Sequence, residues 1–592
     1  MSIIVQKFGG TSVADSQKIL AAARKAIRAQ REGNQVVMVV SAMGKNTDTL
    51  VDLAGQITGS PPAREMDMLL STGEQVSVAL MAMAIDSLGH KAISMTGAQI
   101  GIKTDSAHMK ARIHSIETDR MREALAAGKI IIAAGFQGID EAFNITTLGR
   151  GGSDTTAVAL AAGLGADACE IYTDVDGIYT TDPRIVPEAR RVTRISYDEM
   201  LELASAGAGV MHNRSIEFAK KFGVPVHVRS SFSDTPGTMI VDQPESRELP
   251  VCGAAMSRME ARVTVPGVPD RPGAAMTVFS KIAERNIGMD MIVQNIAAEG
   301  HADISFTVMR DELPATIKAV EEAVRELGAE GHDCDDEVSK ISVVGVGMAT
   351  QSGVAQTMFR ALAEKGINIM MITTSEIKIS VLVERKYAPE ALRAVHDAFG
   401  LDREPPRIDP DRSTTHERLE EDATADLVAR LESMENLFIE DVWLDTSQAR
   451  VTMPGVEDVP GLAARVFDEI GEAGIVVDMI VQSTGHQGHA NISFTVRQTD
   501  LEKCLALTGE LAKSLHCPPP TNSPKVAKLS VFGVGMKSHT DVASRMFRSL
   551  AAAGINVDMI STSEVRVNVV VDGAQGPRAL GVLQKELEDL IV

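Results

Sequence analysis

The stretch Lys7-Phe8-Gly9-Gly10-Thr11-Ser12 ends an alternating apolar run over residues 3–8 and places a cation, two glycines and two hydroxyls after a predicted strand. Adjacent glycines let the backbone approach a polyanion with no Cβ in the way. A helix predicted over residues 13–31 would offer unpaired N–H groups and a positive dipole end to the same anion. The stretch therefore predicts a phosphate site, with Lys7 as a point charge beside the phosphate.

This predicted site differs from a Walker A loop, because its lysine precedes the glycines and the chain has no GxxxxGK[ST] segment. An ordinary strand-to-helix turn would also explain these six residues taken alone. The rest of the chain has to decide between the two interpretations.

Length, composition and charge limit the class of protein. A chain of 592 residues predicts about three to five domains. Its 44% hydrophobic and 23% charged residues are typical of a folded globular protein. The formal net charge of -22 argues against nucleic acid as the main partner, because binding phosphates along a strand requires clustered lysine and arginine.

The cysteines and the apolar runs indicate a cytoplasmic protein. The five cysteines are scattered without a CxxC pair, so neither a disulfide framework nor a zinc site is indicated. No leader-like series precedes the first strand, and no apolar run approaches the ~18 residues that a membrane span requires. We expect no membrane association and no metal site built from side chains.

The first 240 residues alternate strand-like apolar runs with helical patterns. The runs cover residues 36–40, 91–94, 130–134, 170–172 and 224–228, and a helical pattern lies around residues 68–88. This alternation predicts an α/β domain with a mostly parallel sheet and helices on both faces. Ligands of such sheets bind beyond the carboxyl ends of the strands.

Four polar segments fall at the predicted ends of strands or helices, and one of them, residues 71–74, is expected to open or interrupt its apolar helix. They are Ser41-Ala42-Met43-Gly44-Lys45-Asn46-Thr47, Ser71-Thr72-Gly73-Glu74, residues 148–156 and residues 172–184. Within residues 148–156, a glycine pair permits close approach of the backbone, and Arg150 can hold a carboxylate in a bidentate fork. Helix capping by Ser153 or Asp154 would also explain this loop.

Together with the first stretch, these segments resemble the motif set of aspartate kinase, in the amino-acid kinase superfamily. The matching motifs, all in the family's order, are Lys7-Phe8-Gly9-Gly10-Thr11-Ser12, Ser41-Ala42-Met43, Ser71-Thr72-Gly73-Glu74, Gly149-Arg150-Gly151-Gly152-Ser153-Asp154 and Tyr172-Thr173-Asp174-Val175-Asp176-Gly177. The resemblance implies ATP- and Mg²⁺-dependent phosphorylation of the β-carboxylate of L-aspartate. The product would be 4-phospho-L-aspartate, at the entry to lysine, threonine and methionine synthesis.

The same resemblance implies roles for single residues. Lys7 and Asp154 would be catalytic, with Asp154 orienting Lys7 or its neighbours. The ATP-binding residues would be Lys7, Gly9, Gly10, Ser41, Thr173, Asp174, Tyr179 and Arg184. The aspartate-binding residues would be Thr47, Glu74, Arg150, Gly151 and Ser153. Glu74 would meet the ammonium group of aspartate, and Arg150 its α-carboxylate.

The second half of the chain is a tandem repeat with an offset of 188 residues. The segment starting Arg262-Val263-Thr264-Val265-Pro266-Gly267 recurs from Arg450, and Asp290-Met291-Ile292-Val293-Gln294 recurs from Asp478. Each copy contains a weaker internal repeat, in which residues 262–308 resemble residues 340–383. Four α+β units with a βαββαβ pattern of the ferredoxin-like type follow from this.

These units resemble ACT domains, which bind amino acids at paired interfaces, and Asp270-Arg271-Pro272-Gly273 and Asp458-Val459-Pro460-Gly461 carry the signature. In the family the effector lies between the two units of a pair. With neighbouring units paired in sequence order, the effector contacts would be Asp270, Gln294, Val354 and Asn368 in the first pair. They would be Asp458, Gln482, Val542 and Asn556 in the second. Lysine or threonine, or both, are the implied effectors.

The predicted domain boundaries follow from these repeats. A catalytic domain covers residues 1–245, and the first (250–335), second (336–401), third (438–523) and fourth (524–592) units follow it. Residues 402–437 form a linker; its segment 402–435 carries 11 acidic and 5 basic residues, and residues 419–431 predict a short amphipathic helix. Because ACT units commonly bury strand edges by pairing, a homodimer or higher homo-oligomer is expected.

Other functions stay open at this point. Acetylglutamate kinase, glutamate 5-kinase and UMP kinase belong to the same superfamily, although the predicted clamp favours a free amino acid over UMP. A non-catalytic amino-acid sensor with a kinase fold is an alternative from another class. The presence of Lys7, Glu74, Arg150 and Asp154 together argues against that alternative.

Overall fold

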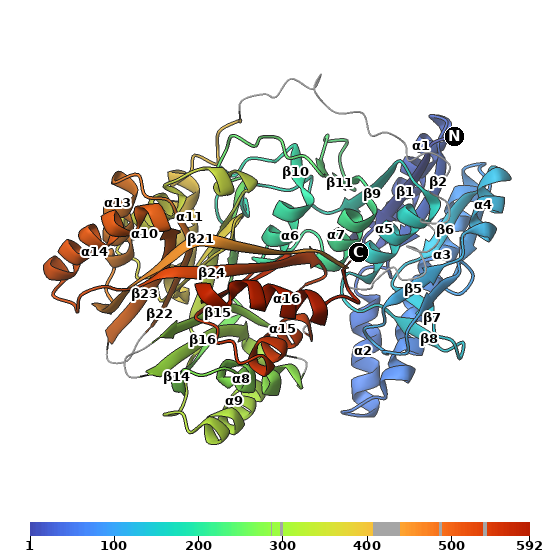
Figure 1. Ribbon diagram of the computed structural model, residues 1–592. Coiled ribbons are helices and arrows are strands. Elements are labelled where there is room, and N and C mark those ends of the chain that lie inside the picture. Colours follow the sequence, from blue (N-terminus) through green and yellow to red (C-terminus); the bar gives the residue numbers. More distant parts are fainter. Residues whose placement is uncertain (286, 297–299, 406–437, 485–487, 537–540, 592) are drawn as a thin grey trace.

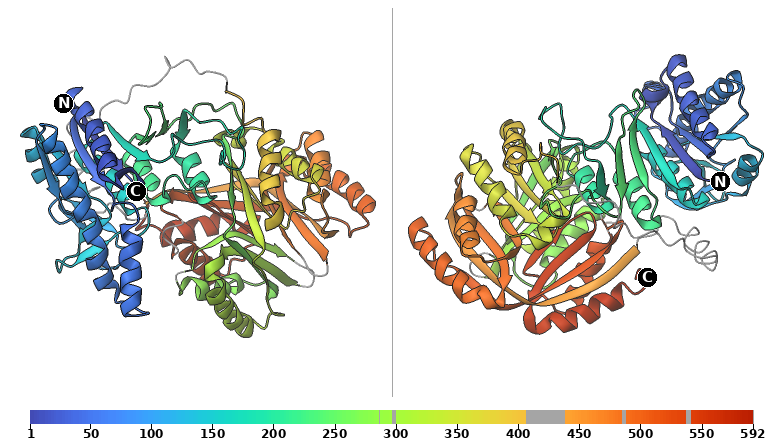
Figure 2. Two further views of the ribbon diagram at one scale, coloured as in Figure 1. Left: turned by 180° about the vertical axis from the view of Figure 1, so that it is seen from behind. Right: turned by 90° about the horizontal axis from the view of Figure 1, so that it is seen from above.

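The computed structural model describes residues 1–285, 287–296, 300–405, 438–484, 488–536 and 541–591. An N-terminal lobe surrounds a mostly parallel sheet, and a C-terminal lobe holds the four units (Figure 1). Seen from above, the two lobes lie side by side (Figure 2). The predicted linker and the helix predicted over residues 419–431 fall almost wholly outside the described residues.

The central sheet of the N-terminal lobe has eight strands in the order β10-β12-β11-β9-β1-β2-β6-β3. Neighbouring strands are parallel, except for the antiparallel pair β11 and β12. Their bounds are β1 (Ile3–Phe8), β2 (Gln35–Val40), β3 (Ala92–Met95), β6 (Ile130–Ala134), β9 (Ala168–Thr173), β10 (Arg194–Ser196), β11 (Val226–Ser230) and β12 (Thr238–Val241). The predicted α/β sheet is confirmed.

Helices cover both faces of this sheet because its inner strands are apolar on both sides. In β2, Val37 and Val39 pack into one core, and Met38 and Val40 pack into the other. The helices are α1 (Ser16–Arg31), α2 (Asn46–Ile57), α3 (Ala63–Ser87), α4 (Asp119–Ala126), α5 (Gly152–Leu164), α6 (Tyr197–Ser205) and α7 (Asn213–Phe222). A small sheet of β4 (Ile102–Thr104), β5 (Ile113–Ile116), β7 (Gln137–Ile139) and β8 (Ile145–Thr147) flanks them.

Two predicted helix boundaries are wrong. The first helix begins at Ser16 rather than at residue 13, because Asp15 caps it by accepting the Lys18 N–H group, and a 3-10 turn (Gly10–Val13) follows the glycines. The segment 71–74 neither opens nor interrupts its helix, since α3 runs unbroken through it. Its hydroxyls bond to carbonyl groups of the preceding turn, as Thr72 does to Leu69 at 2.7 Å.

Helix α3 is also long and apolar enough to span a membrane by length and composition, alone among the described helices. Half of its apolar stretch is buried inside the protein, where it packs against α1, α2 and β3. Met81 and Ile85 on α3 are fully buried. In this structure α3 is a core helix of the N-terminal lobe.

The C-terminal lobe contains a ten-stranded sheet and a four-stranded sheet. The strands are β13 (Gly253–Ser257), β14 (Glu260–Pro269), β15 (Met289–Ile296), β16 (His301–Met309), β17 (Asp333–Asp335), β18 (Val338–Val344), β19 (Met371–Thr374), β20 (Lys378–Glu384), β21 (Phe438–Glu457), β22 (Val477–Thr484), β23 (His489–Arg497), β24 (Thr521–Val534), β25 (Met559–Thr562) and β26 (Arg566–Asp572). The helices are α8 (Ala274–Ala283), α9 (Leu313–Leu327), α10 (Val354–Glu364), α11 (Ala388–Ala398), α13 (Leu462–Glu472), α14 (Leu501–Leu515), α15 (Asp541–Ala552) and α16 (Gly576–Glu586).

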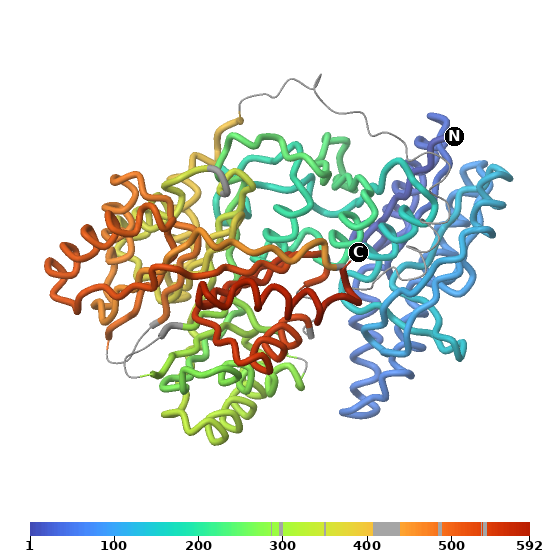
Figure 3. The backbone as a smooth tube through the Cα atoms, in the orientation of Figure 1, coloured from blue at the N-terminus to red at the C-terminus, as the bar shows by residue number. Residues whose placement is uncertain are grey.

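The helix faces of the four units pair across the two sequence copies. The first unit lies beside the fourth, and the second beside the third (Figure 3). Strands β19 of the second unit and β22 of the third are hydrogen-bonded neighbours in the ten-stranded sheet. The tandem duplication is retained, but the expected pairing of neighbouring units is wrong, because their apolar helix faces pack against the other copy.

All four units also meet in one shared core. Its buried residues come from the first unit (Met291, Val293), the second (Val338, Met371, Leu382), the third (Met479, Val481) and the fourth (Val526, Met559, Val570). The faces and edges that were expected to bind a second chain are therefore largely covered within this one. The homodimer stays a prediction, without its original argument from unpaired edges.

Candidate functional site

The candidate catalytic site lies at the carboxyl ends of β1, β2 and β9, where the first motif meets the start of α5. Lys7, near the end of β1, places its Nζ atom 2.5 Å from Oδ1 of Asp154 on α5. The two side chains are 12% and 13% exposed, so the pair is shielded from water without being sealed. The structure thus brings together the two residues predicted to be catalytic.

The glycine loop after β1 lies directly against the loop after β2. A Cβ atom on Gly10 would lie only 2.7 Å from the carbonyl oxygen of Ala42, so a larger residue cannot fit without moving one loop. The Gly44 N–H group donates to the Gly10 carbonyl at 3.0 Å, and the Ser41 N–H group donates to Phe8 at 3.1 Å. Ser41 and the glycines thus form one continuous backbone surface.

Glu74 is a buried carboxylate on α3, facing the same loop. One of its oxygens accepts the Ala42 N–H group at 3.0 Å, and its side chain is only 4% exposed. The other oxygen, Oε2, has no hydrogen-bond partner among the described residues. Burial raises the pKa of Glu74 from 4.5 to about 7. This carboxylate is suited to a cationic ligand group that would stabilise its charged form.

The loop from Gly149 to Asp154 has the backbone shape that its glycines predict. Gly149 and Gly151 have φ values of 76° and 70°, a conformation that L residues rarely adopt. Arg150 between them is exposed, whereas Ser153 is buried on the first turn of α5. An exposed arginine on a glycine-shaped loop is free of the fold's own packing and available to a carboxylate.

The remaining aspartate-site prediction, Thr47, lies in the first turn of α2 and is partly exposed. Among the predicted nucleotide residues, Thr173 ends β9, and its hydroxyl donates to Asp174 at 3.1 Å. The Tyr179 hydroxyl donates to Asp176 at 2.9 Å, and burial raises the pKa of Tyr179. These residues follow the strand next to β1, where the topology places a ligand.

Arg184 is the exception among the predicted nucleotide residues. Its guanidinium group binds Asp182, with Nη2 2.8 Å from Oδ2, and its side chain is 88% exposed. The hydrogen bonds to Asp182 raise its pKa further above the usual range. In this structure Arg184 points to solvent, so contact with a phosphate would require a move away from Asp182.

Sequence reasoning missed a buried carboxylate with several hydrogen bonds beneath the Arg150 loop. Asp67 on α3 is fully buried and accepts from Thr147 at 2.5 Å and from Nδ1 of His108 at 2.7 Å. The Met109 N–H group donates to the same carboxylate at 3.0 Å. The available signal was a charged residue directly before a predicted apolar helix, where an unpaired charge would be costly.

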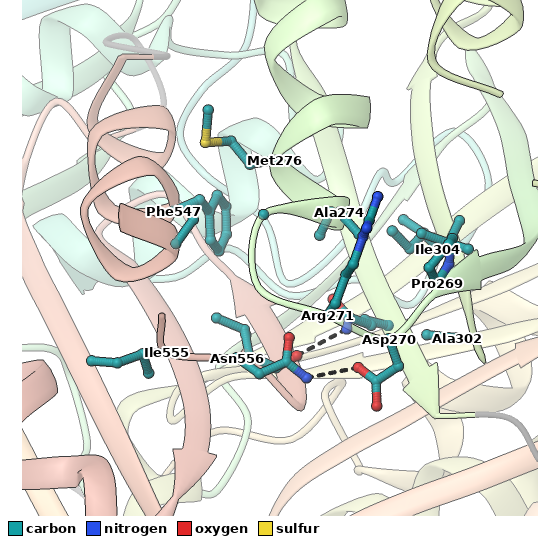
Figure 4. A pocket seen from close by; sticks show the side chains of 16 residues that line it. Pro269, Asp270, Arg271, Ala274, Met276, Ala302, Ile304, Phe547, Ile555 and Asn556 are labelled. Carbon is teal, nitrogen blue, oxygen red and sulfur yellow. Dashed lines mark hydrogen bonds between the residues drawn. The ribbon is translucent and has the colours of Figure 1, made fainter. Parts of the chain in front are cut away.

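The first candidate effector pocket lies between the first and fourth units (Figure 4). The Asn556 side-chain amide donates to Asp270 at 2.7 Å, and the Gln294 amide donates to the Val557 carbonyl at 2.9 Å. Phe547 and Met276 lie at its upper side. Oε1 of Gln294 is buried without a hydrogen-bond partner among the described residues, so an acceptor faces this region.

The second candidate effector pocket repeats this arrangement between the second and third units. The Asn368 amide donates to Asp458 at 2.9 Å, and the Gln482 amide donates to the Ile369 carbonyl at 3.1 Å. Burial raises the pKa of Asp458. Each pocket therefore joins two residues of one predicted set with one residue of the other, which corrects the grouping made from the sequence.

Two of the predicted effector contacts have a different place. Val354 and Val542 are 7% and 0% exposed and belong to the apolar cores beneath the paired helices. Neither lines the pocket that its unit forms. Each of these valines, at the start of its helix, packs inward because the helix presents that face to its own sheet.

Comparisons with known proteins agree with this architecture. A model of the amino acid kinase family matches residues 2–230, and an ACT domain model matches residues 341–399, 452–508 and 529–587. The aspartate kinase of Pseudomonas putida is 52% identical over 404 residues, which cover 68% of this chain and 98% of that protein. The aspartokinase of Pseudomonas aeruginosa is 51% identical over 405 residues, with the same coverage of both chains.

Solved structures extend the similarity. The crystal structure of aspartate kinase from Synechocystis is 41% identical, covers 99% of this chain and is itself covered to 98%, with a TM-score of 0.52. E. coli aspartokinase III in complex with aspartate and ADP is 25% identical, covers 67% of this chain and is covered to 99%, with a TM-score of 0.56. On these matches and this site, the chain belongs to the aspartate kinase family.

Proposed function

We propose that this chain transfers the γ-phosphoryl group of ATP to the β-carboxylate of L-aspartate, giving 4-phospho-L-aspartate. The observation that carries the proposal is the Lys7–Asp154 ion pair beside a glycine-lined loop, with the buried Glu74 carboxylate on the other side of that loop. A cation for phosphate and an anion for an ammonium group thus lie beside two loops that touch at Gly10 and Ala42. Family membership supports the same reaction.

The mechanism we infer is an in-line displacement in which charge and position supply most of the rate. The attacking β-carboxylate is ionised near pH 7, so no general base is required. Lys7 stabilises the charge that develops on the transferred group, and Asp154 holds the Lys7 ammonium in place. The backbone of Gly9, Gly10 and Ser41 borders the phosphates.

The substrate clamp in this proposal uses two opposite charges. Glu74 binds the ammonium group of aspartate, and Arg150 binds its α-carboxylate in a bidentate fork. Thr47, Gly151 and Ser153 complete the aspartate site. A clamp for both charges of a free amino acid favours aspartate over N-acetylglutamate, whose nitrogen is uncharged, and over UMP.

The nucleotide would bind along the end of β9 through Thr173, Asp174, Tyr179 and, after a side-chain movement, Arg184. Mg²⁺ would arrive with ATP and neutralise part of the charge on its phosphates, as expected of a cation that keeps most of its water ligands. Among the described residues, no group of three or more histidine, cysteine, aspartate or glutamate side chains could hold a metal ion.

We further infer feedback regulation by lysine, threonine or both, at the two pockets between units. Each pocket offers a carboxylate and an amide oxygen, Asp270 with Gln294 and Asp458 with Gln482, which suit the ammonium group of an amino acid. Such control would place the chain at the entry to lysine, threonine and methionine synthesis. E. coli aspartokinase III, a relative in structure, has been crystallised in complex with lysine and aspartate.

The test of the reaction is ATP consumption by the purified chain with Mg²⁺ and each of L-aspartate, L-glutamate, N-acetyl-L-glutamate and UMP. We expect turnover with aspartate alone. Turnover with another acceptor would move the function within the superfamily. Tight amino-acid binding without turnover would favour a non-catalytic sensor.

The test of regulation compares two matched variants, Asn556→Ala and Asn368→Ala, which each remove the amide that bridges one pocket. Calorimetry with L-lysine and L-threonine, singly and together, should show that each variant loses binding at one pocket and keeps the other. Unchanged binding in both variants would show that the effectors bind elsewhere.

A further inference from the structure

One buried carboxylate of the N-terminal lobe touches both pairs of units. Glu202 lies on α6, which together with α7 faces the C-terminal lobe (Figure 1). Glu202 is fully buried and lies 2.7 Å from Nζ of Lys378 in the second unit. It also accepts the Glu564 N–H group of the fourth unit at 3.0 Å.

The two contacts come from equivalent turns of the repeat. Lys378 begins β20 after the turn that follows β19, and Glu564 lies in the turn between β25 and β26. At their other ends, β19 and β25 begin two residues after Ile369 and Val557, which line the two effector pockets. One four-residue strand therefore connects each pocket with the junction at Glu202.

From this junction a second contact reaches the first turn of α7. The Asn213 side-chain amide donates to Oε2 of Glu564 at 2.7 Å. The next residue, Arg214, points its fork the other way and donates to the carbonyls of Leu148 and Ala111, both at 2.6 Å. Leu148 lies two residues before Arg150. Two adjacent residues in the first turn of α7 therefore contact the fourth unit and the loop that carries Arg150.

The same turn contacts that loop at another point. A Cβ atom on Gly151 would lie 2.3 Å from Cβ of His212, the residue that precedes α7. The loop backbone and the start of α7 are therefore packed without a gap. Because a packed turn moves as a body, a shift of the Glu564 turn would be passed to the Arg150 loop.

We propose that Arg214 is a positioning residue for the aspartate-binding loop, and that the Asn213–Glu564 hydrogen bond couples it to the fourth unit. The inference rests on the proposed function, because it takes Arg150 as part of the aspartate clamp. By reciprocity, a ligand between the first and fourth units changes aspartate affinity, and aspartate changes the fourth unit.

The positioning role is tested with Arg214→Lys, which keeps the charge but cannot bridge two carbonyls with a planar fork. We expect the KM for aspartate to rise about tenfold and the KM for ATP to stay within about twofold, because the glycine loop is untouched. Hydrogen exchange of residues 145–152 should accelerate, while the unfolding midpoint stays near that of the parent chain. An unchanged KM for aspartate in a folded variant would overturn the role.

The coupling is tested with Asn213→Ala, and Glu376→Gln serves as the matched control. Glu376 occupies the position of Glu564 in the second unit, but it pairs with Arg566 inside the C-terminal lobe. The readout is hydrogen exchange of residues 559–566, measured with and without aspartate and MgADP. We expect these ligands to slow the exchange in the parent chain and in the control, and to leave it unchanged in Asn213→Ala. Equal protection in all three would overturn the coupling.

The outcomes separate this inference from the proposed function. If the parent chain does not phosphorylate aspartate, the proposed function fails first. If the parent chain is active and both variants match it in KM and in exchange, the proposed function stands and the coupling through Asn213 and Arg214 fails. The exchange experiment requires only aspartate and MgADP as ligands. It therefore tests the coupling even if neither lysine nor threonine inhibits the enzyme.

Discussion

At Lys7 the fold keeps a single ammonium group next to one carboxylate at the mouth of the site. The 2.5 Å contact with Asp154 orients the side chain and leaves it 12% exposed, so the charge remains available to a phosphoryl group. This arrangement suits a group that acts by position and charge rather than by proton transfer.

We predict that Lys7→Ala lowers kcat by about 10³-fold with little change in aspartate binding, because one stabilising charge is lost from the transition state. Steady-state kinetics and aspartate titration measure the two effects. The control is Lys18→Ala, which removes a partly exposed lysine of α1 that pairs with Asp15. Near-normal turnover of Lys7→Ala would remove this lysine from the mechanism.

Glu74 predicts a pH dependence. Its pKa is raised to about 7 by burial, so the free enzyme holds a proton on Glu74 below that pH and must release it to bind an ammonium group. The kcat/KM for aspartate should therefore rise about tenfold between pH 6 and pH 8. Glu74→Gln should give a low, flat profile. A parent profile without a step near neutral pH would contradict the assignment.

The same pKa shift has a consequence for stability, with a sign that follows from linkage. The unfolded chain ionises Glu74 near 4.5 and the folded chain near 7, so stability falls as pH rises through this window. At pH 8, Glu74→Gln should therefore raise the unfolding free energy, by up to about 3 kcal/mol. Denaturant titration at pH 8 and pH 5 measures the difference, which should shrink at the lower pH.

At the scale of the elements, the loops after β1 and β2 approach each other closely at Gly10. Gly10→Ala would push a Cβ atom against the Ala42 carbonyl and separate the loops that border the phosphates. We expect kcat/KM for ATP to fall about 100-fold, because small displacements of positioning groups cost large factors.

The matched control for this loop is Gly55→Ala, in the interior of α2, where a Cβ atom meets nothing within 4 Å. It should keep full activity and add about 0.5–1 kcal/mol of stability, since alanine favours the helix. Equal kinetics for the two variants would show that the Gly10 contact does not position ATP.

The elements also show what a sequence can predict. The predicted bounds of β1 and β6 agree with the observed ones. The apolar residues alternate in β1 and are continuous in β6, and strands buried on both faces leave such a plain pattern. The polar run in α3 misled, since Ser71 and Thr72 satisfy their hydroxyls on the helix's own carbonyls.

In the site, Lys7 and Asp154 are in contact as the motifs predict. Lys7 lies near the end of a strand and Asp154 near the start of a helix. Arg214 and Asp67 were missed. Both act on backbone groups of loops distant in sequence, and no local pattern reports such contacts. The same holds for Asn213 and Glu564, which are 351 residues apart.

On the scale of the whole molecule, the duplication gives each unit two candidate partners. The first and third units are equivalent, and so are the second and fourth, so a pair of unlike units can form in several ways. The sequence repeat fixes the equivalence but not the choice of partner. The structure selects the crossed pairs, in which Phe359 of the second unit lies 5.5 Å from Phe467 of the third, measured between ring centroids.

This equivalence predicts the behaviour of a chain cut after residue 401. Removal of the third and fourth units would expose the apolar helix faces of the second and first, and soluble proteins rarely leave such large patches uncovered. Since the first unit is equivalent to the lost third, it can pair with the second unit of another copy. We therefore expect residues 1–401 to form a tight dimer. Sedimentation velocity at micromolar concentration would measure its mass.

Adding Phe359→Asp to the cut chain should weaken that dimer, because a charge would enter the re-formed contact. A folded, active monomer of the cut chain would show that the units do not need partners and that their crossed pairing is not what stabilises the lobe.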